Sequence, residues 1–148
     1  MENINKKIKT DLCELSSLLQ ATLEEFVTVS EEIKDNKLKM ALRGFAVETR
    51  QYEHELNAQL QSLRIKEIDY PGSVRFEQLL QNSHSAVESS TDEAISEVCQ
   101  ASEASFDKAY GKVLNEYLLS SDLRSMLIYQ WKGIKYSFIK MKLLNSIQ

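Results

Sequence analysis

The stretch from Ile8 to Ile33 decides the fold, and it reads IKTDLCELSSLLQATLEEFVTVSEEI. Its apolar residues recur at alternating steps of three and four, the spacing that places side chains on one face of an α-helix. The pattern predicts a helix from about Asn5 to Ile33. Seven of the eight positions on its stripe are apolar, and the eight are Ile8, Leu12, Leu15, Leu19, Thr22, Phe26, Val29 and Ile33.

Three further stretches of the chain carry the same helical spacing. The second helix is expected to run to about Arg64 after the polar break 34–36, in which Asp35 or Asn36 can cap it. The third is expected from a capping-box sequence at 90–93 to about Leu118, and the fourth follows a second short break at 120–122. The expected stripes are Leu38, Leu42, Phe45, Thr49, Tyr52, Leu56, Gln59 and Leu63 in the second helix, Ile95, Val98, Ser102, Ser105, Ala109 and Val113 in the third, and Leu123, Leu127, Gln130, Ile134, Ser137, Met141 and Leu144 in the fourth.

The only proline of the chain, Pro71, stands next to Gly72 and interrupts the helical pattern. Residues 74–87 after it have the spacing of a short helix, which would carry the chain between two helical hairpins. The sequence therefore predicts an all-α, antiparallel four-helix bundle with ferritin-like connections, and with a short helix between the second and third long helices. The length fits a single ferritin-like domain over residues 1–148.

The net charge is −4, from 18 basic and 22 acidic side chains. This balance argues against a nucleic-acid-binding protein, which needs an excess of Lys and Arg on one face. The N-terminus shows no continuous apolar segment of the signal-peptide kind, and no apolar run approaches the roughly 20 residues of a membrane span. We therefore expect a cytoplasmic protein with no nucleic acid or membrane as partner. In that compartment its two cysteines, Cys13 and Cys99, are expected to be buried thiols.

Charge is distributed unevenly along the second half of the chain. From Glu77 to Asp107 there are seven acidic residues and no Lys or Arg, whereas from Leu123 onward there are five basic residues and no acidic one. We expect the third and fourth helices to lie side by side, because opposite charges then become neighbours, although each exposed pair contributes only roughly 0–1 kcal/mol. A basic surface for an anionic ligand is the alternative interpretation of the fourth helix.

Ferritin-like bundles that bind two iron or manganese ions use Glu on two helices and Glu-x-x-His on the other two. Hard or borderline cations prefer such carboxylate and imidazole ligands. The set is incomplete in this chain, because Gln51 and Gly133 stand where the two His are expected. Its two histidines, His54 and His84, lie elsewhere and are expected at or near the surface. The candidate ligands are Glu25 (or Glu24) in the first helix, Glu48 in the second, Glu103 in the third and Gln130 in the fourth.

Several polar residues fall on the expected seams between the helices. A buried layer of this kind must be hydrogen-bonded or hydrated, because an unpaired buried polar group costs roughly 1–3 kcal/mol. Two interpretations are open: small side chains that allow close helix approach, with Gln130 fixing the register, or the remnant of a ligand-binding centre. The residues of this layer are Thr22, Thr49, Ser102, Ser105, Gln130 and Ser137.

The fourth helix also carries large side chains outside the main stripe. The spacing of Trp131, Tyr136 and Phe138 is typical of packing residues rather than of an aromatic pocket. Ile128 and Ile139 lie off the stripe, and they would either cover the connecting helix or form a dimer patch.

Three stretches, KLKMAL at 37–42, FAVETRQY at 45–52 and EASFDKAY at 103–110, resemble a bacterial family of ferritin-like bundles classed as a domain of unknown function. Gln130 and the short helix expected after Pro71 also fit this family, so the resemblance covers nearly the whole chain. It implies the ferritin-like fold and a bacterial intracellular protein, and it implies no established activity. Members of the family often carry His where this chain has Ser137, and this departure weakens a metal assignment here.

The leading hypothesis is a non-enzymatic helical-bundle protein without a cofactor, in an interaction or structural role. It would act through its surface on an unknown protein partner or as a homodimer, and a link to stress follows only by analogy with related bundles. The alternative is a carboxylate-rich iron- or manganese-binding protein or oxidase that uses Glu25, Glu48, Glu103 and Gln130. No phosphate-binding glycine loop, GxSxG motif or plausible Cys–His pair points to another chemistry.

Overall fold

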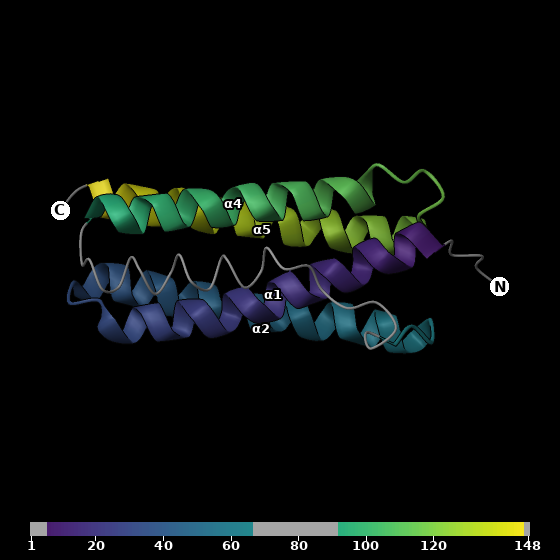
Figure 1. Ribbon diagram of the computed structural model, residues 1–148, viewed down its shortest axis with the longest axis horizontal. Coiled ribbons are helices and arrows are strands. Elements are labelled where there is room, and N and C mark those ends of the chain that lie inside the picture. Colours follow the sequence, from purple (N-terminus) through teal and green to yellow (C-terminus); the bar gives the residue numbers. More distant parts are fainter. Residues whose placement is uncertain (1–5, 67–91, 147–148) are drawn as a thin grey trace.

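The computed structural model describes residues 6–66 and 92–146, which form four α-helices and no β-strand (Figure 1). The helices are α1 (Lys6–Glu32), α2 (Asn36–Ser62), α4 (Asp92–Leu114) and α5 (Ser121–Ser146). The all-helical prediction is confirmed for this part of the chain, and none of its helices has the length and apolar character that crossing a membrane requires. The short helix expected at 74–87, His84 and the start of the capping box at 90–91 lie outside the described residues.

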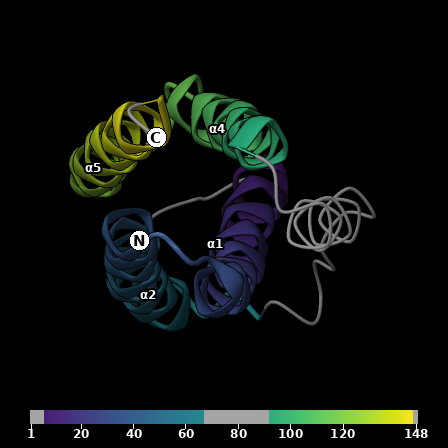
Figure 2. The same ribbon diagram turned by 90° about the vertical axis from the view of Figure 1, so that its left-hand side faces the viewer.

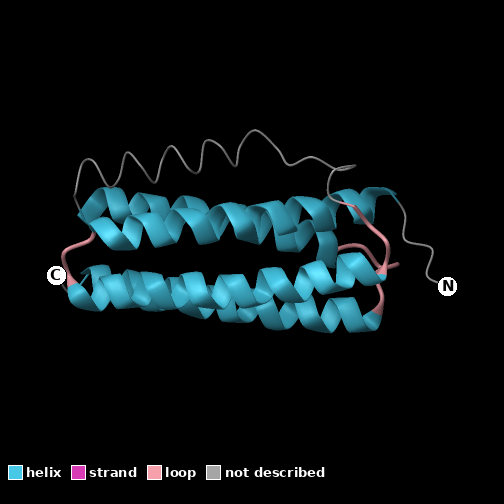
Figure 3. Cartoon of the chain, turned by 90° about the horizontal axis from the view of Figure 1, so that it is seen from below, coloured by secondary structure: helices cyan, strands magenta, loops and turns pink. Residues whose placement is uncertain are grey.

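The four helices lie lengthwise beside one another as a bundle (Figure 3). α1 packs against α2 and α4, and α5 packs against the same two helices. Seen along the bundle in Figure 2, α1 and α5 therefore occupy opposite corners, as do α2 and α4. Each helix has two neighbours and must bury a correspondingly broad face.

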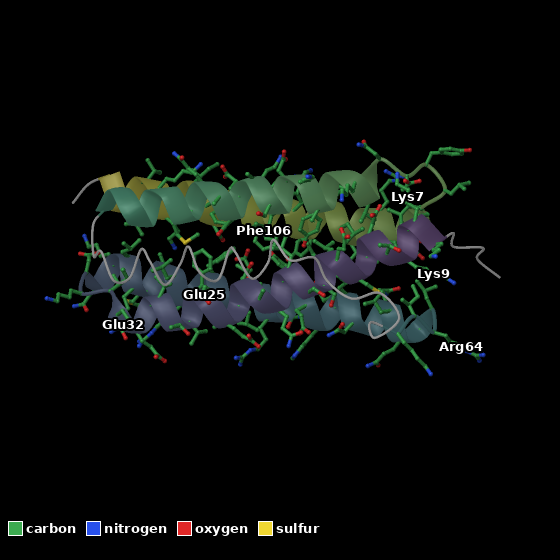
Figure 4. The ribbon with its side chains drawn as sticks, in the orientation of Figure 1. Lys7, Lys9, Glu25, Glu32, Arg64 and Phe106 are labelled. Atoms are coloured by element: carbon green, nitrogen blue, oxygen red, sulfur yellow. The ribbon has the colours of Figure 1, made fainter. Side chains whose placement is uncertain are left out.

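Side-chain contacts show which parts of the neighbouring helices lie opposite each other. In all four interfaces, higher residue numbers in one helix face lower numbers in the other. The contacting pairs are Ser16–Asn57 and Phe26–Phe45 between α1 and α2, Glu14–Lys112 between α1 and α4, Glu48–Ser137 and Glu55–Gln130 between α2 and α5, and Glu103–Lys142 and Tyr110–Gln130 between α4 and α5. At the start of α1, Lys7 (labelled in Figure 4) also pairs with Glu116, which follows α4.

The centre of the core is a cluster of four phenylalanines, one from each helix. Phe26, Phe45, Phe106 and Phe138 are at most 2% exposed, and their ring centroids lie between 5.0 and 6.5 Å apart. Most of the contacts are edge-to-face, an arrangement worth about 0.5–1.5 kcal/mol per pair beyond the area buried. This cluster joins all four helices in one apolar layer.

The expected stripe of α1 is confirmed from Ile8 to Val29, all of whose members are buried. In α2 the prediction for Gln59 is wrong, because Gln59 is exposed and Leu60 is buried beside it. The prediction of a single stripe is also too narrow in α4, where Phe106 and Tyr110 join the core. A helix with two neighbours buries more than one residue per turn. A predicted stripe with one residue per turn therefore misses part of the buried face.

Predictions for the large side chains of α5 have a mixed outcome. Trp131 and Phe138 are buried as expected, but the prediction for Tyr136 is wrong, because its side chain is 71% exposed. The acidic third helix of the prediction, α4, was expected to lie beside the basic fourth helix, α5. An ion pair bears this out, in which Lys142 Nζ lies 2.7 Å from Glu103 Oε1.

Asp35 is the N-cap of α2, because its carboxylate accepts a hydrogen bond of 2.8 Å from the amide of Leu38. We expect Asp35→Ala to lower the free energy of unfolding by about 1 kcal/mol, since one helix-start amide loses its partner. Asp35→Ser should retain most of that stability. Urea unfolding measures both changes. Asp107→Ala, at an exposed position of α4, is the control and should stay within about 0.5 kcal/mol; equal losses at the two positions would contradict the capping role.

Candidate functional site

Gln130 lies in the middle of α5 with no exposed surface, and its amide makes hydrogen bonds to two other helices. Its Oε1 accepts from the hydroxyl of Tyr110 on α4 at 3.0 Å. Its Nε2 donates to Glu55 Oε1 at 3.0 Å and to the carbonyl oxygen of Tyr52 at 3.3 Å, both on α2. Both hydrogens of the amide nitrogen are therefore used. This geometry fits the interpretation in which Gln130 fixes the register of the helices.

Tyr110 is held from two sides. Its hydroxyl donates to Gln130, and its ring stacks on Trp131 with a centroid distance of 5.5 Å and an interplanar angle of 12°. On Trp131 in turn lies the ammonium group of Lys135, 4.7 Å from the ring centroid. Burial raises the pKa of the Tyr110 hydroxyl well above its usual value, so the group stays protonated and remains a donor.

Glu48 is half-buried on α2, where hydroxyl groups surround its carboxylate. Oε1 accepts from Tyr52 Oη at 3.1 Å, and both carboxylate oxygens lie 3.3 Å from Ser137 Oγ on α5. Burial, followed by the charge of Glu48, raises the pKa of Tyr52, so this hydroxyl also remains protonated. A Cβ at Gly133 would lie only 2.1 Å from Tyr52 Oη. A His was expected at position 133. The Tyr52 hydroxyl fills the space that a side chain at this position would need.

The other two candidate ligands lie apart from this network. Glu103 on α4 is half-buried and forms the ion pair with Lys142. Glu25, in the part of α1 far from Lys7 in Figure 4, is only 5% exposed, whereas the neighbouring Glu24 is exposed.

The structure therefore brings two of the four candidates together. Glu48 and Gln130 belong to one hydrogen-bond network through Tyr52, and Glu103 is held by a lysine. Within residues 6–66 and 92–146, no three or more His, Cys, Asp and Glu side chains lie close enough together to hold a metal ion. Of the two histidines, His54 is exposed as expected.

The remaining polar residues of the predicted seam divide into two groups. The hydroxyls of Thr49 and Ser105 donate to carbonyls one turn earlier in their own helices, at 2.7 and 3.0 Å. These two fit the interpretation of small side chains whose hydrogen bonds stay within one helix. The buried hydroxyls of Thr22 and Ser102 have no hydrogen-bond partner among the residues that the structure describes.

The two cysteines are free thiols and buried, as predicted. Burial raises the pKa of the Cys99 thiol to about 11. At neutral pH this thiol is protonated, and a protonated thiol is a poor nucleophile. Burial therefore disfavours the thiolate form that Cys99 would need as a nucleophile.

A surface groove of about 480 Å³ lies between α2 and α5, and the sequence patterns alone did not reveal it. Met40 and Tyr136 flank it, 72% and 71% exposed, and Lys37 and Lys140 also line it. The signal that could have predicted it is a second helical spacing off the core stripe: Tyr129, Tyr136 and Leu143 are seven residues apart, as are Met40 and Val47.

Comparison of the chain with protein-family models, curated proteins and solved structures finds no significant match.

Gly133→Ala should be destabilising, because the added Cβ would overlap Tyr52 Oη and displace it from Glu48. Overpacking costs about 1–3 kcal/mol, and the better helix propensity of Ala offsets about 1 kcal/mol of it. In a Tyr52→Phe background the oxygen is absent, so the same substitution should be better tolerated. Urea unfolding of the wild type, the two single variants and the double variant measures this coupling.

Gly44→Ala is the matched control, because a Cβ at Gly44 meets nothing within 4 Å. It should raise the free energy of unfolding by about 0.5–1 kcal/mol through helix propensity alone. A coupling energy of zero between positions 52 and 133 would contradict the close approach of Tyr52 Oη to Gly133.

Proposed function

We propose that this chain is a non-enzymatic helical-bundle protein that acts by contacting a protein partner through its surface. One observation carries the proposal: Glu48, Glu103 and Gln130, three of the four groups that would have to bind a metal, are bound by other groups of the protein. Hydroxyls donate to Glu48, an ammonium group pairs with Glu103, and a hydroxyl donates to the Gln130 oxygen. A metal would have to displace all of these donors.

The helices support an antiparallel bundle with ferritin-like connections as part of this proposal. The contacts of α1 with α2 and with α4 each pair high residue numbers with low ones, which supports a direction of α1 opposite to both and a shared direction of α2 and α4 at opposite corners. Ferritin-like connections produce this arrangement, and the simplest up-down-up-down order does not. A fold carries no activity by itself, because function depends on the particular side chains that it presents.

Exposed apolar side chains support a role in protein contact. Clusters of such side chains on a protein surface commonly mark interaction sites. Ile128 and Ile139, the candidates for a dimer patch, are 37% and 54% exposed, and they share α5 with other exposed apolar residues. The exposed large apolar residues of α2 and α5 are Met40, Val47, Ile128, Tyr129, Tyr136, Ile139 and Leu143.

Metal analysis tests the proposal. Protein purified without chelator should contain no stoichiometric iron or manganese, and adding Fe(II) or Mn(II) should leave the melting temperature unchanged. A ligand that binds only the native state would raise it.

Glu48→Ala and Glu103→Ala, with the exposed Glu31→Ala as control, identify the ligands if metal is found. Two tightly bound equivalents that the first two variants abolish and the control retains would overturn the proposal in favour of the metal-binding alternative. Light scattering over a concentration series then separates a homodimer, whose mass rises with concentration, from a protein that acts on a different partner.

A further inference from the structure

Five exposed apolar side chains of α2 and α5 form a surface that we name the α2–α5 face: Met40, Val47, Tyr129, Tyr136 and Leu143. They are between 59% and 72% exposed. Within each helix they are seven residues apart, so they lie on one side of that helix, two turns from one another. The ring of Tyr129 contacts Tyr52 of α2 at a centroid distance of 6.2 Å, which places this side of α5 toward α2. Heptad spacing of this kind suits a helical partner.

The groove shares Met40 and Tyr136 with the α2–α5 face. Its lining on α2 extends from Lys37 to Glu48, which at ~1.5 Å per residue is about 16 Å, or three turns of a partner helix. Phe45 is buried in its floor, and Met40 and Tyr136 stand at its sides. A small-molecule pocket encloses most of its ligand, typically 70–90% of the surface. A groove whose flanking side chains are more than 70% exposed encloses much less, and it matches the shape that an amphipathic helix occupies.

Charge around the groove is positive, although the whole chain carries −4. Lys37 and Lys140 line it, and α5 has no acidic residue from Leu123 to its end. Glu48 is the one acidic group among the described lining residues, and its oxygens accept hydrogen bonds from Tyr52 and Ser137. A partner with carboxylates is therefore electrostatically complementary. A second copy docked by the same face would set lysines against lysines.

Gly44 lies in this groove in the interior of α2, and nothing in the described part of the protein requires a glycine there. A Cβ at Gly44 would meet no atom within 4 Å, in contrast to Gly133. A glycine in a helix interior costs roughly 0.5–1 kcal/mol relative to alanine. Because Gly44 has no side chain, the middle of the groove stays open, and the backbone of a partner can approach closely there.

We infer that the groove between α2 and α5 binds an acidic amphipathic helix of a partner protein. The apolar side of that helix packs on Met40, Phe45 and Tyr136, and its carboxylates lie near Lys37 and Lys140. The inference rests on the proposed function, in which the surface contacts a protein, and it names the chemistry of that partner.

Fluorescence anisotropy with a labelled probe tests the inference on the full chain. The probe is a designed 18-residue helix with Leu at the a and d positions of each heptad and Glu on the opposite side. Two controls have the same length: one with Lys in place of every Glu, and one with the Leu and Glu residues scrambled so that no apolar side forms. The acidic amphipathic probe should bind, with an affinity that falls as salt is added, and each control should bind at least tenfold more weakly.

Variants locate the binding. Lys140→Glu should weaken binding at least tenfold, whereas Lys108→Glu, at an exposed position of α4, should leave it unchanged. Gly44→Met fills the groove and improves helix propensity. It should therefore raise the melting temperature and still weaken binding at least tenfold, a combination that unfolding cannot produce.

The inference would be overturned by no binding of the acidic probe, or by binding that Lys140→Glu and Gly44→Met leave unchanged. Preference of the same face for phosphatidylserine vesicles or for duplex DNA over the peptide would also overturn it, because the partner would then belong to another class. The failures can be told apart. If the protein contains no metal and does not bind the probe, only this inference is contradicted. If the protein contains stoichiometric metal, the proposed function itself is contradicted.

Discussion

The buried amide of Gln130 is the interaction on which the arrangement of this bundle depends. It joins α5 to Tyr110 of α4 and to Glu55 and the Tyr52 carbonyl of α2. An amide without partners in an apolar core costs roughly 1–3 kcal/mol per group, so only a register that supplies all three partners is acceptable. Sliding α5 by one turn, about 5.4 Å, would break all three of these hydrogen bonds. The four phenylalanines stabilise the core next to it, and the amide selects one alignment of the helices.

The same network engages groups that a metal ion would need as ligands. In a di-metal bundle, carboxylates and imidazoles converge on ions. Here each corresponding group binds another side chain of the protein: Tyr52 donates to Glu48, Tyr110 donates to Gln130, and Lys142 pairs with Glu103. Gly133 follows from this arrangement, because Tyr52 Oη occupies the place of its Cβ. The proposed function uses the outside of the bundle, where apolar side chains and lysines share one face of α2 and α5.

The helices could be predicted because helical periodicity and caps are local. The stripe from Ile8 to Val29, the cap at Asp35 and the end of the break before α5 all depend on residues within a few positions. The errors at Gln59 and Tyr136 have a different origin. Which residues beside a stripe are buried depends on how each helix is rotated toward its two neighbours, and that rotation is a property of the whole bundle.

The site could be predicted only in part, for the same reason. Gln130 was recognisable as a polar residue on a core stripe, but its partners Tyr110 and Glu55 come from two other helices and depend on their registers. The absence of His at Gly133 is visible in the sequence, whereas its cause, the Tyr52 hydroxyl, is visible only in three dimensions. The α2–α5 groove left a weaker trace, the heptad spacing of Tyr129, Tyr136 and Leu143 outside the core stripe.

Urea unfolding of Gln130→Glu at pH 7, with and without Fe(II) or Mn(II), tests the central role of this amide most directly. An ionised carboxylate there would have no hydrogen to donate and would face the acceptors Glu55 and the Tyr52 carbonyl, and protonating it in this buried position would itself cost free energy. The account predicts a loss of about 2–4 kcal/mol that neither metal restores, because two hydrogen bonds are replaced by repulsion between acceptors. Unchanged stability, or recovery on adding metal, would contradict it.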